Sequence, residues 1–316
     1  MLTSKPAETI QNAHKRIRPY IHQTPVLESR QLNELLNAQV YFKCENLQKV
    51  GAFKMRGAAN AVFSLKPEER QKGVATHSSG NHAQALALAA RLAGIPAYIV
   101  MPSTAPKVKV AAVKGYDAEV IFCEPTLAAR ETTLQEVVAR TGAHFVHPYN
   151  DERVIAGQAT AAKELFEQVK EPLDVVITPV GGGGLLSGAV LAARSFSPAT
   201  KVWAGEPAGA DDAYRSLQDG MLVPQTAPNT IADGLLTSLG DITYAIISKG
   251  VEQIILVSEE EIIEAMRFLW ERMKLVVEPS GAVPLAAALK EKEVLKEKRI
   301  GIIISGGNVD LSKLPF

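Results

Sequence analysis

Short apolar runs alternate with longer amphipathic stretches along almost the whole chain. Several of the short runs are continuously hydrophobic, which is typical of parallel strands that helices cover on both faces. The expected strands are Val40–Cys44, Val74–Ser78, Ala97–Met101, Glu119–Cys123, Asp174–Val180, Lys201–Gly205, Gln253–Val257 and Arg299–Ser305.

The longer stretches between these runs have the spacing of helices, and the alternation of strand and helix predicts an α/β protein with open sheets. A length of 316 residues is enough for about two domains. The segment Gly209–Ser238 is polar and irregular, so we expect it to be rich in loops. The expected helices are Asn81–Ala93, Ala128–Thr141, Ile155–Val169, Leu185–Phe196, Glu259–Lys274 and Ser280–Lys290.

The composition excludes several classes of partner. Lys+Arg and Asp+Glu are equal at 34 each, so no excess of positive charge indicates a nucleic-acid or membrane-surface partner. No apolar run approaches the ~20 residues of a spanning helix, and no secretory signal is visible, so we expect a cytoplasmic protein. Cys44 and Cys123 lie in apolar runs and are expected to be buried free thiols.

Three turns with small residues each follow a predicted strand, at the end of the strand where open α/β sheets bind ligands. The first is Ser78-Ser79-Gly80-Asn81-His82, whose backbone N–H groups could bind a carboxylate or phosphate, or which could simply cap a helix. The second is the run Gly181, Gly182, Gly183 and Gly184, and the third is Ser305-Gly306-Gly307-Asn308. The serine of the third turn could hydrogen-bond a heterocycle nitrogen, although a plain turn is the alternative.

The four consecutive glycines carry the most information of the three turns. Each costs roughly 0.5–1 kcal/mol relative to Ala in regular structure, so the run favours a backbone that approaches an anion closely over a flexible loop. The spacing lacks the last glycine of a dinucleotide-binding motif and the Gly-Lys-Ser/Thr of a P-loop. The run therefore predicts a site for one phosphate.

Lys54 is the candidate catalytic residue. It lies in Gly51-Ala52-Phe53-Lys54-Met55-Arg56-Gly57, among small and apolar residues and near a second cation. Such a setting lowers the pKa of a lysine and suits Schiff-base chemistry, whereas most lysines are solvated surface charges. A phosphate site together with such a lysine indicates pyridoxal 5'-phosphate (PLP).

A further loop could hold a metal ion. The segment Glu206–Asp212 has carboxylates separated by backbone carbonyls, a pattern that can bind Mg²⁺ or Ca²⁺. A solvated turn is the alternative on spacing alone.

These motifs together resemble those of the fold-type II PLP enzymes, specifically the family of serine racemases, serine/threonine dehydratases and threo-3-hydroxyaspartate ammonia-lyases. The resemblance runs from His22-Gln23-Thr24-Pro25 to Ser305-Gly306-Gly307-Asn308-Val309-Asp310. It implies two open α/β domains with the cofactor in the cleft between them. We expect a discontinuous large domain (1–72 and 151–316) and a small mobile domain (73–150) that binds the substrate.

The resemblance also implies a role for each site residue. Lys54 would carry the cofactor and act as one α-proton base, and Ser79 would serve the opposite face. The implied cofactor residues are Phe53, Lys54, Asn81, Gly181, Gly182, Gly183, Gly184, Leu185 and Ser305. The implied substrate residues are Ser78, Ser79, Gly80, Asn81, His82, Arg130 and Thr237. The implied ligands of Mg²⁺ (or Ca²⁺ or Mn²⁺) are Glu206, the carbonyl of Ala210, and Asp212.

Two features bear on which member of the family the chain is most similar to. Ser79 gives the Ser-Ser-Gly-Asn-His sequence of racemase-type members, where typical threonine dehydratases have alanine at this position. Arg130 matches an arginine placed to meet an acidic group on a ligand, and its alternative is a solvated position on a helix. We therefore expect α-proton removal from a small hydroxy-amino acid, followed by reprotonation or by loss of the β-hydroxyl. The alternative is a threo-3-hydroxyaspartate ammonia-lyase that yields oxaloacetate and ammonia.

The family resemblance further implies a homodimer. Some members bind ATP at a subunit interface, but Val50 and Arg30 replace hydroxylated residues of that pattern, which argues against ATP activation. A β-replacement transferase shares the fold but matches the motifs less well. A non-catalytic binding protein would not need both Lys54 and Ser79.

Overall fold

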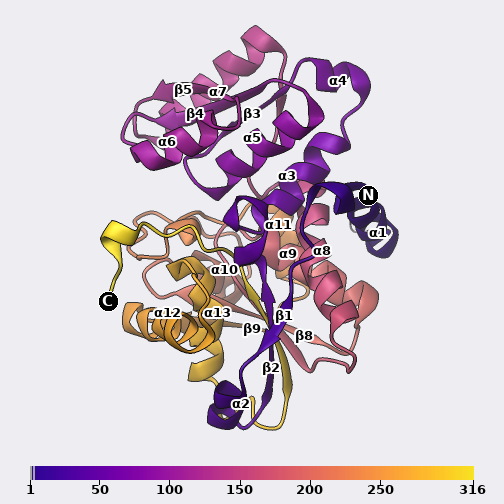
Figure 1. Cartoon of the computed structure of the whole chain (residues 1–316), viewed down its shortest axis with the longest axis vertical. Helices are drawn as coiled ribbons and strands as arrows, with labels where there is room; N and C mark the ends of the chain where they lie inside the picture. Colours follow the sequence, from indigo (N-terminus) through magenta and orange to yellow (C-terminus); the bar gives the residue numbers. More distant parts are fainter. Residues whose placement is uncertain (1, 3) are drawn as a thin grey trace.

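The computed structural model describes residues 2 and 4–316, so residues 1 and 3 of the expected large domain lie outside the described part. Two sheets organise this part of the chain (Figure 1). The larger sheet has six strands in the order β1-β2-β10-β7-β8-β9, and the smaller has four in the order β5-β4-β3-β6. The strands are β1 (Val26–Glu28), β2 (Gln39–Cys44), β3 (Val74–His77), β4 (Ala97–Pro102), β5 (Glu119–Cys123), β6 (His144–Phe145), β7 (Val175–Pro179), β8 (Lys201–Pro207), β9 (Gln253–Val257) and β10 (Arg299–Ile304).

All neighbouring strands in both sheets are parallel except β1, which runs antiparallel to β2. The α-helices of the described chain are α1 (Pro6–Ile17), α2 (Arg30–Leu36), α3 (Lys54–Phe63), α4 (Pro67–Gln71), α5 (Asn81–Ala93), α6 (Lys107–Lys114), α7 (Leu127–Thr141), α8 (Glu152–Gln168), α9 (Gly184–Phe196), α10 (Asp212–Asp219), α11 (Asp241–Ile247), α12 (Glu259–Met273) and α13 (Pro279–Lys290).

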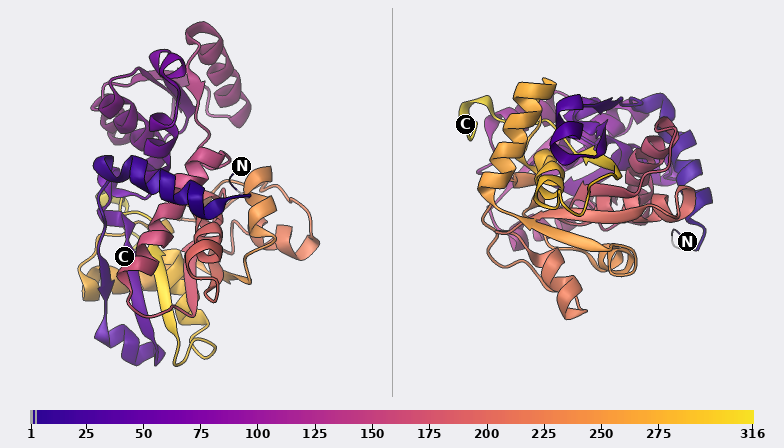
Figure 2. Two further views of the ribbon diagram at one scale, coloured as in Figure 1. Left: turned by 90° about the vertical axis from the view of Figure 1, so that its right-hand side faces the viewer. Right: turned by 90° about the horizontal axis from the view of Figure 1, so that it is seen from below.

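Helices cover both faces of the six-stranded sheet, as its continuous apolar strands predict (Figure 2). Strand β7 is buried along its whole length, and its alternate residues belong to two different cores. One core contains α12 and α13, and the other contains α8 and α9. The four-stranded sheet has its own core against α5, with a smaller cluster against α7 on its other face.

The α/β class with two open sheets is confirmed, and each expected strand and helix is present within three residues of its expected ends. The pattern missed strands β1 and β6, which have only three and two residues. It also missed α3, because that helix is buried from Met55 to Val62 and so lacks a polar face. Helix α1 was missed as well, although its buried residues Ile10, Ala13 and Ile17 have the spacing of an amphipathic helix.

The segment Gly209–Ser238 is rich in loops, as expected, although it also contains helix α10, which ends at a glycine with positive φ. The expectation for the two cysteines needs correction. Cys44 is buried as expected, whereas Cys123 is only half buried because it ends β5, the edge strand of the smaller sheet. Neither cysteine is in a disulfide.

The path of the chain leaves the six-stranded sheet after β2 and returns to it at β7. The smaller sheet takes its strands from residues 74–145 alone. Helix α3 lies between the two sheets, since Met55 and Ala58 belong to the core of the smaller sheet while Arg56 bonds with α8. The domain boundaries, and any motion of the smaller unit, stay predictions. In the described residues, no helix is both long and apolar enough to span a bilayer.

Candidate active site

The segment that carries Lys54 is attached to the turn that follows β10. The Phe53 N–H donates to the Ser305 carbonyl at 2.9 Å, and the Gly307 N–H donates to the Gly51 carbonyl at 2.9 Å. Ala52 and Gly306 form a short antiparallel bridge between the two segments. The structure therefore brings together two of the predicted motifs that are about 250 residues apart in the chain.

Lys54 is the first residue of α3 and is not a solvated surface lysine. Its ammonium group donates to the Pro148 carbonyl at 2.9 Å and lies 5.1 Å from the centroid of the Phe53 ring. Burial lowers the pKa of Lys54 to about 8, although the charge of Glu278 acts to raise it. An amine with this pKa is half deprotonated at about pH 8, so a far larger fraction of it is available as a nucleophile or base than for an ordinary lysine.

The turn Ser78–His82 joins β3 to α5 and lies partly exposed. Ser78 Oγ accepts a hydrogen bond from the Gly80 N–H at 3.3 Å, and no side chain caps the helix. Among the described residues no hydrogen bond is made by the Ser79 hydroxyl. His82 Nε2 lies 3.3 Å from the Val146 carbonyl, while its buried Nδ1 has no partner. The N-terminal N–H groups of α5 are therefore left for a ligand.

Histidine side chains near this turn are kept neutral. Burial and then the charge of Lys54 hold the pKa of His82 well below its ordinary value. Burial and the nearby His77 lower the pKa of His147 to about 4. His147 Nδ1 accepts from the Asn150 N–H at 2.9 Å, which leaves its proton on Nε2. Near neutral pH these rings act as hydrogen-bonding groups without charge.

Asn81 is oriented by two partners. Its Nδ2 group donates to Glu278 at 2.9 Å from one oxygen and 3.2 Å from the other, and its Oδ1 accepts from Asn308 Nδ2 at 2.8 Å. Glu278 precedes α13 and is 4% exposed. Ser305 is buried at the end of β10, next to Gly306, and a Cβ on Gly306 would lie 2.5 Å from Glu278 Oε1.

The glycine run joins β7 to α9 and is completely buried. Gly183 has a φ of +84°, which favours glycine. A Cβ on Gly182 would lie 2.3 Å from Cδ1 of the Tyr149 ring, and one on Gly181 would lie 2.8 Å from the Leu235 Cα. Close packing of this chain therefore explains part of the glycine content. The free N–H groups at the start of α9 remain suited to an anion.

Arg130 and Thr237 lie near the same region but not in its buried part. Arg130 is half exposed on α7. Burial and then the charge of Arg130 lower the pKa of His77, the residue just before Ser78. Thr237 is exposed, and its hydroxyl hydrogen-bonds the Tyr149 phenol.

The predicted metal ligands lie close together and are buried. The Glu206 carboxylate accepts from the Ala213 and Tyr214 N–H groups at the start of α10. Asp212 Oδ2 accepts from the Leu239 N–H, while the buried Asp212 Oδ1 has no partner. Burial raises the pKa of Glu206 well above its usual range and that of Asp212 to about 6.

No group of three or more His, Cys, Asp or Glu side chains with the geometry of a metal site occurs in the part of the chain that the structure describes. A site here would therefore combine two carboxylates with backbone carbonyls or water. The partnerless oxygen and the two raised pKa values would suit a bound cation.

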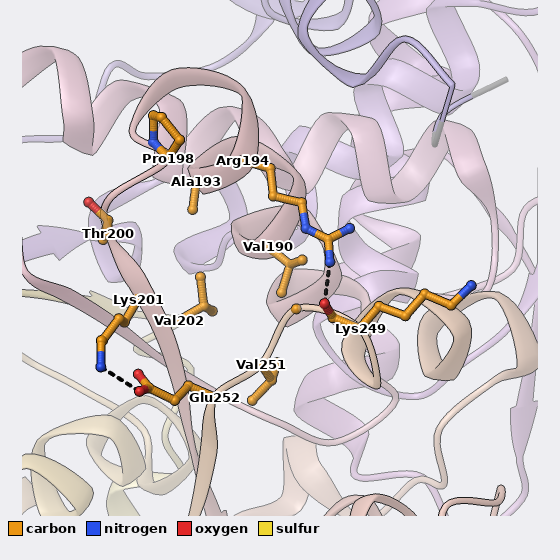
Figure 3. Close-up of a pocket in the computed structure, with 11 residues that line it drawn as sticks. Val190, Ala193, Arg194, Pro198, Thr200, Lys201, Val202, Lys249, Val251 and Glu252 are labelled. Carbon is orange, nitrogen blue, oxygen red and sulfur yellow. Dashed lines mark hydrogen bonds and ion pairs between the residues drawn. The ribbon is translucent and has the colours of Figure 1, made fainter.

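Sequence reasoning missed Glu278, Tyr149 and the Pro148 carbonyl. Glu278 precedes an ordinary helix, and Tyr149 and Pro148 follow a two-residue strand, so no local pattern marks them. A separate cavity of about 320 Å³ lies at the other end of the larger sheet, near the start of β8 (Figure 3). It contains none of the predicted site residues, and its acidic side chain, Glu252, is bonded to Lys201.

Comparison with known proteins agrees with this arrangement. Residues 17–306 match the family model described as "Pyridoxal-phosphate dependent enzyme", and the chain belongs to this family. It is therefore a fold-type II PLP-dependent enzyme, as its motifs predicted.

Within the family, the chain is similar to a beta-hydroxyaspartate dehydratase of Paracoccus denitrificans, with 53% identity over 96% of both chains. It is also similar to a serine racemase of Dictyostelium discoideum, with 54% identity over 96% of this chain and 95% of that one. A solved threonine deaminase from T.th. has a TM-score of 0.92 and 43% identity, and the match covers 97% of this chain and 99% of that one. The expected activity and its alternative are both represented among these relatives.

Proposed function

We propose that the protein removes the α-proton of a small hydroxy-amino acid and then either returns a proton or expels the β-hydroxyl. The first outcome racemises the substrate, and the second yields a 2-oxo acid and ammonia. The observation that carries this proposal is Lys54, a partly buried lysine whose pKa burial lowers to about 8 and whose segment is bonded to one of the three turns predicted to bind ligands.

The residues present fit PLP. A partnerless buried His82 nitrogen, a spare N–H on Asn81 and the start of α9 provide polar groups that protein contacts do not fully use. When bound, the cofactor withdraws electrons from the α-carbon of the substrate and so makes its proton removable. Asn81 would donate to the phenolic oxygen, Phe53 would pack on the ring, Gly181–Leu185 would bind the phosphate, and Ser305 would face the pyridine nitrogen.

The chain's own side chains would move the protons. The Lys54 amine takes the α-proton on one face of the substrate, and the Ser79 hydroxyl serves the opposite face. N–H groups of Ser78–His82 would bind the substrate carboxylate, and Thr237 would add a contact. Racemisation uses both faces, whereas elimination needs only Lys54 together with protonation of the departing hydroxyl, which leaves as water.

A threo-3-hydroxyaspartate ammonia-lyase is the second candidate, and Arg130 favours it. After burial, the charge of Arg130 acts to lower the pKa of His77, one residue before the turn proposed to bind the substrate carboxylate. From that position a guanidinium group could pair with a second carboxylate on the substrate. The products would then be oxaloacetate and ammonia.

The test is borohydride reduction of the holoenzyme followed by peptide mapping. We expect the label on Lys54, and we expect Lys54→Ala to lose both the label and turnover. Lys107→Ala, which changes an exposed lysine at the start of α6, is the matched control and should retain both. A label on any other lysine would show that the site is elsewhere. Assays of 2-oxo acid and D-amino acid with L-serine, L-threonine and both hydroxyaspartate diastereomers would then rank the substrates.

We also propose that Mg²⁺, or Ca²⁺ or Mn²⁺, binds Glu206, the Ala210 carbonyl and Asp212. Both carboxylates are completely buried, and paired anions need a cation or protons in such a setting. The ion would stabilise the fold around α10 and would take no part in proton transfer.

Finally, we propose a homodimer in the cytoplasm without ATP activation. Large apolar side chains remain exposed on the single chain, including Leu47, Val276 and Leu311, which is consistent with a subunit interface. Sedimentation of the purified protein would give the oligomeric state, and turnover with and without ATP would test activation.

A further inference from the structure

A buried carboxylate, that of Glu278, contacts the predicted cofactor residue Asn81 and has no role in the proposal above. Glu278 is 4% exposed at the start of α13, and its carboxylate reaches two of the predicted motifs. The carboxylate accepts a hydrogen bond from Asn81 Nδ2. It also lies against Gly306, the neighbour of Ser305, since a Cβ on Gly306 would be 2.5 Å from Glu278 Oε1. A buried charge raises the free energy of the folded state unless hydrogen bonds or an opposite charge compensate it.

The hydrogen bonds around Glu278 determine which way the Asn81 amide points. The Val50 carbonyl can only accept, so Asn308 must direct its Nδ2 group toward it, at 2.7 Å. The same Nδ2 group donates to Asn81 Oδ1 at 2.8 Å. Asn81 Nδ2 therefore faces Glu278, and an ionised carboxylate can only accept. A reversed Asn81 would place two donors against each other at Asn308 and two acceptors against each other at Glu278.

We propose that Glu278 is a positioning residue with two effects, an inference that rests on the proposed function. It orients Asn81 so that the side-chain N–H group donates to the cofactor, and it places a negative charge near Lys54. One hydrogen of Asn81 Nδ2 is used by Glu278, and the other remains for the phenolic oxygen. Without an acceptor at position 278, the Asn81 amide would lose the partner that fixes its nitrogen on the cofactor side.

The electrostatic surroundings leave Glu278 mostly ionised only above about pH 7. Burial and the charge of Asp233 raise the pKa of Glu278 to about 7, against the hydrogen bond from Asn81, the charge of Lys109 and the Asn308 N–H. Glu278 in turn raises the pKa of Lys54 against the effect of burial. The charged groups that face Glu278 are thus Asp233 from the 3₁₀ turn Asp233–Leu235, Lys109 from α6 and Lys54 from α3. Lys109 is itself paired with Asp233 at 2.8 Å.

The experiment compares Glu278→Gln with the wild-type protein in two measurements. The first is the affinity for PLP, followed by quenching of protein fluorescence. The second is the pH dependence of Lys54 modification by an amine reagent in protein freed of the cofactor, followed by peptide mapping. We expect an affinity at least about tenfold weaker, because the neutral oxygen of glutamine is a weaker acceptor for the Asn81 amide than a carboxylate is. We also expect a modification midpoint lower by on the order of one pH unit, because a nearby negative charge is gone.

Two further variants separate contact from charge. Glu278→Asp keeps the charge but shortens the side chain, so it should retain a modification midpoint near that of the wild type and still lose cofactor affinity. Asp233→Asn removes a neighbouring charge that does not contact Asn81, so its cofactor affinity should stay within about twofold of wild type. Glu278→Asp also serves if Glu278→Gln fails to fold.

The outcomes distinguish this inference from the proposed function. If the wild-type protein binds PLP at Lys54, but Glu278→Gln has wild-type affinity and an unchanged midpoint, the inference is wrong and the proposed function stands. Wild-type affinity in Glu278→Asp would also overturn it where the glutamine variant does not fold. If the wild-type protein does not bind PLP at Lys54, the proposed function fails and this inference fails with it.

Discussion

Replacing Arg56 with methionine should lower the free energy of unfolding by a large amount. Arg56 is completely buried two residues after Lys54, and its guanidinium group donates to both oxygens of Glu45 and both oxygens of Glu164 at 2.7–2.9 Å. A fifth bond runs to Thr160. Methionine fills the space of the aliphatic stem but has no guanidinium group, so the change removes these five bonds and leaves a small cavity between the two carboxylates.

The cost depends on what remains for the two carboxylates. Glu164 keeps Lys43, at 2.7 Å, and His14. Glu45 keeps the Thr24 hydroxyl at 2.6 Å but no ion pair. Breaking a buried pair by removing one partner costs about 3–5 kcal/mol because a buried charge is left uncompensated. With a total stability of about 5–15 kcal/mol, this is a large share.

The pH dependence gives a second signature. Burial acts to raise the pKa of Glu164, but the hydrogen bonds and charges of His14, Arg56 and Lys43 outweigh it and hold that pKa well below its usual range. A carboxyl with a depressed pKa adds stability above its ordinary pKa, and that stability is lost as the pH falls toward the depressed value. In Arg56→Met this contribution shrinks, and protonation can neutralise the unpaired charge. The deficit should therefore be largest at pH 8 and smaller at pH 5.

Urea unfolding followed by circular dichroism at both pH values measures the deficit. Lys201→Met is the matched control because it breaks an exposed ion pair with Glu252, and such pairs contribute only about 0–1 kcal/mol. Adding Glu45→Gln to Arg56→Met should recover part of the loss. A deficit below about 1 kcal/mol, or one that widens toward acid pH, would refute this account of the network.

Three further predictions concern the site itself. Ser79→Ala should slow racemisation by about 10²–10⁴-fold and leave elimination from L-serine largely intact, because only one face loses its proton donor; α-carbon deuterium exchange that stays at wild-type rates for both serine enantiomers would show that Ser79 does not transfer protons. Arg130→Ala should raise the activation free energy for hydroxyaspartate by ~1.5–3 kcal/mol more than that for serine, as expected for the loss of one charge-assisted hydrogen bond. Equal increases for both substrates would mean that Arg130 has a structural role. Without divalent cations the protein should lose stability as the pH rises from about 4 to above 6, because the raised pKa of Asp212 favours a proton in the folded state. Added Mg²⁺ should restore the melting temperature at pH 7 in wild type but not in Asp212→Ala, and a full response in the variant would place the cation elsewhere.

Local patterns in the sequence determined most of the framework. Strands β7 and β10 are nearly continuous apolar runs. Helices cover both faces of their sheet, so successive residues of each strand must be apolar. Helix ends were predictable within three residues where a cap or a glycine marks them. Elements of two or three residues, and a helix buried on every side such as α3, carry no such pattern.

The motifs were also visible as sequence, since the glycine run and the segment around Lys54 consist of unusual neighbours. What the linear order could not show is which distant groups meet there. The partner of the Lys54 amine is a carbonyl 94 residues away, and the partner of the Asn81 amide is a carboxylate 197 residues away.

Those pairings join the smaller sheet to other parts of the chain, since Pro148 follows β6 and Asn81 follows β3, whereas Glu278 precedes α13 on the larger sheet. Strand order and the packing of whole faces are not properties of any short segment. The pKa values of Lys54 and Glu278 depend on the same packing, because burial and nearby charge set them. The sequence alone therefore predicted the longer strands and several helices and indicated Lys54 as the candidate reactive residue, and the tertiary structure decided the electrostatic environment of that lysine.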